Sequence, residues 1–208
     1  MSAPIDRRRA ILDSAVEVFA RQGFHAARVS DIANEANVAH GLIYHYFDSK
    51  EQILNELFTE RWSLLLEALR EADQTLPTPR EKLEAAASFI VDSYRYDPAV
   101  MKVVIVEVTR AANTFGRIHL PEIAKAYEMV AGMVAEAQAA GEMRDDVDPG
   151  EAALLFFGAV EQFLSGWIFE MLPTGDEEFE SAKRLVVEMI WRGLGPVGAS
   201  VPGLARGA

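Results

Sequence analysis

Cysteine is missing from the 208 residues of this chain. Its absence excludes disulfide frameworks, thiolate zinc sites, iron–sulfur clusters and cysteine nucleophiles. Long apolar runs are missing too, because the longest stretches, such as residues 152–160, are far too short to span a bilayer. Charged residues interrupt the first 30 positions, so no secretory signal is expected there. We therefore expect a cytoplasmic protein with no membrane partner.

The N-terminal quarter of the sequence lacks the excess of acidic residues that the rest of the chain has. The whole chain has 20 basic and 32 acidic residues, for a net charge of −12. Residues 1–50 contain six of each, so the remainder carries the entire negative charge. A polyanionic partner can therefore approach only the N-terminal quarter without strong repulsion. Half of the residues are hydrophobic and a quarter are charged, an ordinary balance for a folded protein.

Three helices are predicted within the first 46 residues. Apolar residues recur at helical spacing over 6–22, with Asp6 as the N-cap and Gly23 as a left-handed residue after the helix end. A short helix over 30–36 ends at Asn37, which tolerates the left-handed conformation. The third helix, 39–46, must be held by packing, because isolated helices below about 12 residues are marginal in water.

Six further helices follow from capping and breaking signals. A capping box precedes the fourth helix in either of two registers, Asp48 with Glu51 or Ser49 with Gln52. Thr78 with Glu81 predicts a capping box before the fifth helix, and Asp148 before Pro149 predicts the start of the eighth. A loop that contains Gly116 and ends near 120–121 is expected before the seventh helix. The expected ranges are about 50–74, 79–96, 98–112, 121–140, 149–170 and 176–194. The apolar run 103–108 also fits a buried strand, but no second strand exists to pair with it, so we predict an all-α fold of nine helices.

Motifs of the common enzyme classes are absent from the sequence. It contains no glycine-rich nucleotide loop, no nucleophile elbow and no zinc-protease motif. His40 and His45 lie five residues apart, a spacing that does not place two metal ligands on one helix face. We therefore expect no enzyme, no metal and no cofactor. Two alternatives stay open: a helical protein-interaction module and a small-molecule enzyme without a recognised motif.

The two short helices at 30–36 and 39–46 predict a helix-turn-helix unit. A tight turn at 37–38 joins them and the first helix braces them, so that the second short helix can enter a DNA major groove. We expect Tyr44 to contact a phosphate, and Lys50 to hold another together with the N–H groups that begin the fourth helix. The candidate DNA-contacting residues are Arg7, Arg8, Arg28, Ser30, Ala39, His40, Gly41, Leu42, Tyr44, His45, Tyr46 and Lys50. The alternative for the aromatic residues is packing inside the protein, which we favour for Phe47.

Residues 7–55 resemble the DNA-binding domain of the TetR family. The resemblance is carried by the segment 11–19, by Gly23, Phe24, Val29, Ile32, Ala33, Ala36, Val38, Gly41, Ile43, Tyr44, Tyr46 and Phe47, and by the segments 49–51 and 53–54. Three positions depart from the family pattern: Asn37 stands where glycine is usual, Ala39 where a serine cap is usual, and Arg28 where threonine is frequent. We expect Ser30 to cap the second helix in place of the usual threonine, and Arg28 to reach a phosphate.

The resemblance implies a homodimeric repressor whose last two helices form the dimer interface. The sequence supports this independently, because 152–169 is apolar on almost every side except at Glu161, Gln162 and Ser165. The expected dimer residues are Phe157, Leu164, Trp167, Ile168, Val186 and Ile190. The alternative is a central helix of a monomeric core. Two-fold pairing would place the two reading helices about 34–36 Å apart, the spacing of successive major grooves.

Apolar residues of the fourth to eighth helices are numerous enough to line a ligand pocket, although the same residues could form a dry core. The candidates are Trp62, Leu66, Phe89, Tyr94, Val104, Val108, Tyr127 and Phe163. A weaker similarity connects the chain with the TetR branch that responds to long-chain fatty acyl-CoA. Arg110 and Arg117 are then candidates for binding the CoA phosphates, because guanidinium groups bind phosphate in a bidentate manner.

The sequence as a whole predicts a ligand-responsive repressor that binds double-stranded operator DNA as a homodimer. Residues 1–50 are expected to form the DNA-binding domain, 51–194 the ligand-binding and dimerisation domain, and 195–208 a flexible tail. Binding of a small apolar effector, with acyl-CoA as the candidate, would shift the population between DNA-competent and incompetent dimers.

Overall fold

The structure is a computed structural model that describes residues 4–109 and 114–196, with the side chains of 7–106 and 119–196. Within these ranges the chain is helical and has no strand. The elements are α1 Pro4–Gln22, α2 Val29–Glu35, α3 His40–Tyr46, α4 Lys50–Thr75, α5 Pro79–Tyr96, α6 Pro98–Val103, a π-helical segment η1 Val104–Thr109, α7 Thr114–Ala139, α8 Pro149–Ile168 and α9 Asp176–Gly193.

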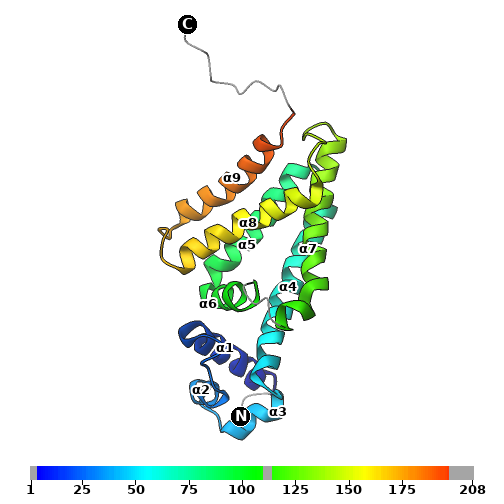
Figure 1. The fold of residues 1–208 in the computed structure, drawn as a ribbon. Helices are drawn as coiled ribbons and strands as arrows, with labels where there is room; N and C mark the ends of the chain where they lie inside the picture. The colour runs from blue at the N-terminus through cyan, green and yellow to red at the C-terminus, as the bar shows by residue number, and fades with distance from the viewer. Residues whose placement is uncertain (1–3, 110–113, 197–208) are drawn as a thin grey trace.

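The helices are arranged along an elongated molecule (Figure 1). Helices α1, α2 and α3 form a small unit at one end, and the long helix α4 leads from this unit into a larger helical body. In the body, α4 packs against α5 and α7, and α8 packs against α7 and α9. Helix α6 lies between the two parts and contacts α1.

The first helices differ slightly from their expected limits. Helix α1 begins at Pro4, so Asp6 lies inside the helix and is not its N-cap. Gly23 and Asn37 adopt the left-handed conformation, with φ of 80° and 51°, as predicted. Helix α2 begins at Val29 with Arg28 as its N-cap residue, so Ser30 does not cap it. The carboxylate of Asp31 instead accepts a hydrogen bond from the Arg28 backbone N–H at 2.9 Å and closes the helix end.

The predicted caps of the later helices are confirmed. Ser49 caps α4, because its Oγ accepts from the Gln52 backbone N–H at 3.2 Å, which selects one of the two expected registers. Thr78 forms the capping box that begins α5. The Asp148 carboxylate accepts from two backbone N–H groups at the start of α8. These local hydrogen bonds satisfy donors that have no partner within the helix.

The segment between α6 and α7 was predicted less well. The expected helix 98–112 is divided into α6 and the π-helical η1, and the apolar run 103–108 is helical as preferred. The expected loop near 116–121 is wrong, because α7 begins at Thr114 and contains Pro121. Proline removes one helical N–H donor, but the helix continues where neighbouring contacts hold it. One such contact comes from Trp62 of α4, whose indole N–H donates to the Glu122 carbonyl at 2.8 Å.

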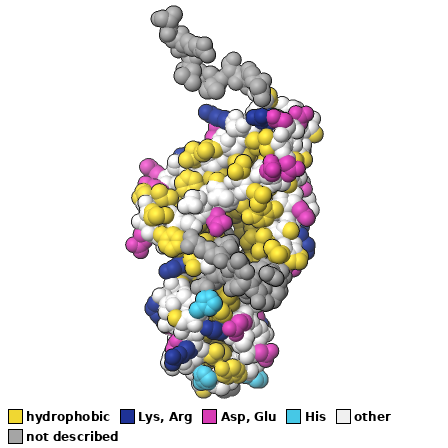
Figure 2. Space-filling model, in the orientation of Figure 1, with side chains coloured by type: hydrophobic (Ala, Val, Ile, Leu, Met, Phe, Trp, Pro, Cys, Tyr) yellow, Lys and Arg dark blue, Asp and Glu magenta, His cyan; other side chains and the backbone are white. Residues whose placement is uncertain are grey.

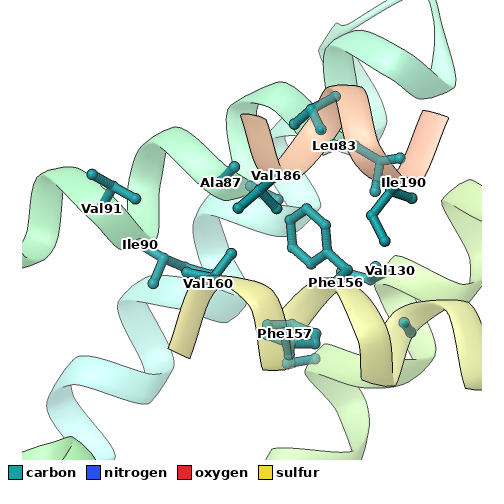
Figure 3. Packing of buried hydrophobic residues seen from close by; sticks show 14 of the residues in the cluster. Leu83, Ala87, Ile90, Val91, Val130, Phe156, Phe157, Val160, Val186 and Ile190 are labelled. Carbon is teal, nitrogen blue, oxygen red and sulfur yellow. The ribbon is translucent and has the colours of Figure 1, made fainter. Parts of the chain in front are cut away.

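Buried apolar residues form two clusters. The N-terminal core joins α1, α2, α3, the first turns of α4 and α6, and it includes the fully buried Phe19 and Phe58. The C-terminal core joins the rest of α4 with α5, α7, α8 and α9. In the C-terminal core the ring of Phe156 lies between α8 and the α9 residues Val186 and Ile190 (Figure 3). Trp62 packs against both cores.

Candidate DNA-binding site and effector pocket

Helix α3 is held by the N-terminal core and presents one face to solvent. Ile43 and Phe47 are almost completely buried, which confirms the preferred packing role of Phe47. The turn before α3 is closed by a hydrogen bond from the Val38 N–H to the Ala33 carbonyl at 3.0 Å. A helix of seven residues is therefore positioned by tertiary packing, as its length requires.

The exposed face of α3 carries aromatic and imidazole side chains. His40, Gly41, Tyr44 and His45 are exposed, and the Tyr44 side chain is 51% accessible. The rings of His40 and Tyr44 meet edge to face, with their centres 5.3 Å apart. Figure 2 shows histidine side chains at the end of the molecule formed by α1, α2 and α3. Among the other candidates on this element, Ala39 is exposed, Leu42 is half-buried, and Tyr46 packs partly against the N-terminal core.

Gly41 has no steric reason to be glycine within the chain. A Cβ atom built at this position would meet nothing within 4 Å. Glycine in a helix interior costs about 1 kcal/mol of stability relative to alanine. The described structure therefore offers no internal benefit that would offset this cost.

The arginines of the N-terminal unit divide into paired and unpaired groups. Arg8 forms a bidentate ion pair with Glu56 of α4 and lies over the Phe47 ring at 4.9 Å. Arg9, next to it, binds Asp13 at 2.9 Å and Glu60 of α4 at 2.8 Å. These two arginines therefore attach α1 to α4. Among the described residues, Arg7 and Arg28 are exposed and have no ion pair, so they meet the expectation for phosphate-contacting residues better than Arg8 does.

Lys50, which is expected to hold a phosphate, contacts backbone carbonyls of its own chain. Its ammonium group donates to the backbone carbonyls of Phe24 at 2.9 Å, His25 at 3.3 Å and Ala27 at 3.0 Å. The nitrogen also lies 4.5 Å from the centre of the Phe24 ring. An ammonium group has three N–H donors, so these contacts use its full donor capacity.

A largely apolar cavity of about 100 Å³ lies where the two cores meet. Its lining residues are Arg61, Trp62, Leu64, Leu65, Phe89, Ile90, Ser93, Met101, Val104, Ile105, Tyr127, Phe157, Val160, Glu161 and Leu164. Four of the expected pocket residues line it: Trp62, Phe89, Val104 and Tyr127. The expected Leu66, Tyr94 and Phe163 do not, and Tyr94 stacks on Trp167 instead. Arg110 and the side chains of Val108 and Arg117 lie outside the described residues.

The sequence interpretation missed the charged residues of this cavity. Arg61 also pairs with Asp97 at 3.4 Å, whereas Glu161 has no ion pair among the described residues. Burial raises the pKa of Tyr127, and the nearby Glu161 carboxylate raises it further. A signal for Glu161 was present, because it is one of the few polar interruptions in the apolar segment of α8.

The expected dimer residues lie mostly inside the chain. Phe157, Leu164, Trp167, Val186 and Ile190 are buried in the C-terminal core, and Ile168 is half-buried. Burial within one chain leaves little surface on the first five of these residues for a dimer contact, whereas Ile168 keeps part of its surface. The exposed apolar residues of α8 and α9 are Leu154, Leu155, Leu185 and Met189. Apolar side chains gather over α8 and α9 on the face shown in Figure 2.

Residues 4–109 and 114–196 contain no group of three or more His, Cys, Asp or Glu residues that could bind a metal ion. Every helix in these ranges is too short or too polar for a membrane span.

The fold and the site define a class of protein: a helix-turn-helix DNA-binding regulator in which α4 connects the reading unit to a helical body with an apolar pocket. Residues 11–57 match the profile of bacterial regulatory proteins of the tetR family, and residues 58–180 match that of the C-terminal region of YsiA-like proteins. The chain belongs to the TetR family.

The relatives of the chain include a regulator of fatty acid metabolism and regulators that were solved with CoA thioesters. The fatty acid metabolism regulator protein of Bacillus subtilis is 34% identical over 159 residues, which cover 76% of this chain and 81% of the relative. The crystal structure of FadR from Bacillus subtilis in complex with stearoyl-CoA is 27% identical, with a TM-score of 0.78 and coverage of 89% of this chain and 98% of that chain. The structure of AibR with isovaleryl coenzyme A and operator DNA shares the fold, at 22% identity and a TM-score of 0.74, over 89% and 98% of the two chains.

These matches confirm the predicted fold class and family. The relatives are transcriptional regulators, so the expectation that the chain is a regulator and not an enzyme is confirmed as well.

Proposed function

We propose that this protein is a homodimeric repressor that binds operator DNA through α3 and releases it when an acyl-CoA thioester occupies the cavity. One observation carries the proposal: the cavity lies at the junction of the two cores, where its lining residues Trp62 and Val104 also pack into the N-terminal core that holds α3. A repressor acts on DNA, so we expect this protein in the cytoplasm. Residues 1–50 and 51–194 would act as the reading and sensing domains.

The exposed face of α3 supports operator recognition. It carries no Lys or Arg, so base edges would be contacted by the imidazoles of His40 and His45 and by Leu42. Tyr44 would contact a phosphate, and Arg7 and Arg28, which have no ion pair among the described residues, would supply the cations that position the protein on the backbone. Gly41 would allow the helix backbone to approach the DNA closely, which explains a glycine that nothing within the described chain requires.

The apolar residues left exposed on α8 and α9 support a dimer. Leu154 and Leu155 lie on α8, and Leu185 and Met189 lie on α9. A second copy of the same two helices would cover these side chains in a four-helix bundle. The two-fold axis would place two α3 helices for successive major grooves.

The cavity supports an apolar effector with a neutral polar group. Its walls are mainly aromatic and aliphatic, and relatives of this fold have been solved with stearoyl-CoA and isovaleryl-CoA. Glu161 has no ion pair among the described residues, so a free fatty acid whose carboxylate came near it would bring a second negative charge toward it. A thioester carbonyl carries no charge, which favours the CoA ester. Arg110 and Arg117 would bind the CoA phosphates in this proposal.

Binding of the effector would act through Trp62 and Val104. A ligand that separates these side chains changes the packing of α4 and η1 against the N-terminal core. Such a ligand shifts the population only if it binds the DNA-incompetent dimer more tightly.

The test is a titration of the full-length protein against DNA from its own upstream region and against a random DNA pool, over a range of salt concentrations. Isovaleryl-CoA, stearoyl-CoA and free stearate are added separately. We expect sequence-preferring binding that weakens steeply with salt and is released by a CoA ester but not by stearate. Binding that no CoA ester releases would overturn the effector, and absence of sequence-preferring binding would overturn the repressor.

The dimer interface is tested with Met189→Glu. Met189 is 67% accessible in one chain, so a carboxylate there should leave the chain folded and oppose association. We expect monomers in sedimentation analysis and a loss of operator affinity of at least about 100-fold, because one reading helix cannot replace two. Leu120→Glu on α7 is the matched control, since Leu120 is 57% accessible and lies outside α8 and α9. A Met189→Glu variant that stays dimeric would contradict this interface.

A further inference from the structure

Three consecutive residues of α4 connect this helix to three different elements. Glu60 accepts a hydrogen bond from Arg9 of α1 at 2.8 Å. Trp62 donates to a backbone carbonyl of α7, also at 2.8 Å. Between these two, Arg61 donates at 3.4 Å to the carboxylate of Asp97, which lies where α5 ends and α6 begins. This turn of α4 is therefore joined to both parts of the molecule.

The Asp97 carboxylate makes two contacts that have different roles. Its Oδ1 atom accepts from the Val100 backbone N–H at 3.0 Å and caps α6, whereas its Oδ2 atom accepts from Arg61. Helix α6 packs on α1, and its residues Val100 and Val103 are buried in the N-terminal core. The ion pair therefore joins α4 to the short helix that contacts the DNA-binding unit.

Arg61 has donor capacity that Asp97 does not use. A guanidinium group carries five N–H donors, and among the described residues Asp97 is the one hydrogen-bonding partner of Arg61. The contact is long, at 3.4 Å, and both side chains are partly exposed. Because a pair of this kind contributes little stability, a competing acceptor oxygen can replace Asp97 at low cost.

Arg61 also lines the cavity, on the side where the cavity meets solvent. Of the described lining residues, Leu64 is the exposed one, at 41%, and it lies one turn after Arg61 on α4. A cavity of about 100 Å³ is smaller than the pockets that enclose drug-sized ligands, so it has no room for the nucleotide of a CoA ester. The acyl group of such an effector would enter beside α4 and leave its thioester close to Arg61.

We propose that Arg61 exchanges partners when the effector binds: its guanidinium pairs with Asp97 in the free protein and donates to the thioester carbonyl of a bound acyl-CoA. Loss of the ion pair detaches α6 from α4 and weakens the support that α6 gives to α1 in the DNA-competent form. The inference rests on the proposed function, because it takes an acyl-CoA as the effector. It deepens that function by naming the group of the effector that is sensed and the residue that senses it.

Two ligands that differ only at the carbonyl test this contact. S-isopentyl-CoA is a thioether that has the carbon skeleton of isovaleryl-CoA but lacks the carbonyl oxygen. We expect the full-length protein to bind isovaleryl-CoA at least about tenfold more tightly in calorimetric titrations, a ratio typical of one hydrogen bond from a charged donor. At saturation the thioether should also release less operator DNA, because it leaves the ion pair in place.

Arg61→Met removes the guanidinium donor but keeps much of the aliphatic stem. We expect this variant to lose the preference for the ester, so that the affinities for the two ligands agree within about twofold. It should still bind operator DNA in the absence of ligand, because Arg61 lies outside the helix-turn-helix unit.

Asp97→Ser removes the competing carboxylate. Serine caps a helix about as well as aspartate does, so α6 should stay capped while Arg61 has no carboxylate to bind. We expect isovaleryl-CoA to bind about two- to fivefold more tightly, the range of a partly exposed ion pair, because its carbonyl no longer competes with Asp97. The affinity for S-isopentyl-CoA should stay the same, whereas a general loosening of α6 would change both affinities. This variant keeps the proposal testable if Arg61→Met fails to fold.

Arg95→Met is the matched control. It removes another partly exposed ion pair at the end of α5, with Asp176 at 2.7 Å, and neither residue lines the cavity. This variant should change neither ligand affinity nor the preference for the ester.

Equal affinities of the unmodified protein for the two ligands would overturn the proposal, and so would an undiminished preference in Arg61→Met. Unchanged affinity for isovaleryl-CoA in Asp97→Ser would overturn the exchange of partners. In each of these cases, release of operator DNA by isovaleryl-CoA would leave the proposed function standing. Failure of every CoA ester to release the operator would instead remove the proposed effector and this inference with it.

Discussion

The two cores of this molecule use charge differently. The N-terminal unit is attached to α4 by ion pairs at the surface, such as Arg9 with Glu60. The C-terminal core contains two nearly buried lysines that bridge helices. Lys82 of α5 binds Asp73 at 3.0 Å and Glu136 at 2.6 Å, and Lys183 of α9 binds Asp92 at 2.7 Å and Glu180 at 2.6 Å. The carboxylate partners of these two lysines are themselves partly exposed.

The difference indicates what holds each region together. Exposed ion pairs contribute little and are screened by salt, so those between α1 and α4 add little to the apolar packing that holds the N-terminal unit on α4. In the C-terminal core the hydrogen bond to Glu136, followed by that to Asp73, raises the pKa of Lys82 despite its burial. Burial lowers the pKa of Lys183, but its two carboxylate partners outweigh this and raise it. These lysines therefore stay charged and join α5 to its neighbours, while the cavity lies where the two cores meet.

The largest loss of stability should follow from truncating a large side chain in the C-terminal core. Phe156 is fully buried, so Phe156→Ala should lower the free energy of unfolding by about 3–5 kcal/mol through lost burial and an unfilled cavity. Urea denaturation of the full chain measures this loss. Tyr96→Ala, at a side chain that is 86% accessible, should change the unfolding free energy by less than about 0.5 kcal/mol. A small loss in Phe156→Ala would show that this core is not tightly packed.

A second prediction compares a buried ion pair with an exposed one. Lys183→Met keeps the aliphatic stem but leaves Asp92 and Glu180 without their donor, so we expect a loss of about 1–3 kcal/mol. Arg21→Met removes the exposed pair with Glu35 and should cost at most about 1 kcal/mol. Thermal unfolding at low and high salt measures both. Equal losses, or an equal response to salt, would remove the distinction between the two regions.

A third prediction concerns the junction between the cores. Trp62→Leu removes the indole that stacks on Phe58 at 5.2 Å between ring centres and donates to the Glu122 carbonyl. We expect the variant to bind operator DNA but to lose most of the affinity change caused by stearoyl-CoA, which in allosteric proteins is typically about 5–150-fold. Phe89→Leu is the control, because Phe89 lines the cavity but packs only against the C-terminal core. It should weaken effector binding and leave the coupling intact, and the same coupling in both variants would argue against Trp62 as the connection.

The smallest effect is a pH dependence at the same junction. His119 is buried against Phe58, with ring centres 4.2 Å apart, and burial lowers its pKa although Glu122 opposes the shift. Because the pKa of His119 is lower in the folded protein than in the unfolded chain, the unfolded chain takes up a proton on this ring more readily as the pH falls below about 6.5. Stability from His119 is therefore present at neutral pH and declines as the pH falls through this range. His119→Gln should flatten the decline in denaturation experiments, whereas His25→Gln, at an exposed position, should not.

Much of the fold could be read from local chemistry. The caps at Thr78 and Asp148 and the left-handed Gly23 and Asn37 follow from the side chain or backbone of single residues, and all four are confirmed. Continuation of α7 through Pro121 could not be read in this way. Helix α7 packs on α4 there, where the Trp62 indole N–H donates to the Glu122 carbonyl, and the local sequence does not contain that contact.

The site was predictable to the level of elements but not of contacts. The sequence by itself specified an all-α chain and a short exposed reading helix, because periodicity and capping are local properties. It also showed that α8 has more apolar residues than one buried helix face can accommodate. The folded structure alone decided that Phe157 and Leu164 face inward while Leu154 and Leu155 face outward. It also decided that Lys50 binds carbonyls about 25 positions away in the chain, and that Glu161 lines a cavity. These outcomes depend on which helices pack together, and contacts between distant segments leave no local pattern in the sequence.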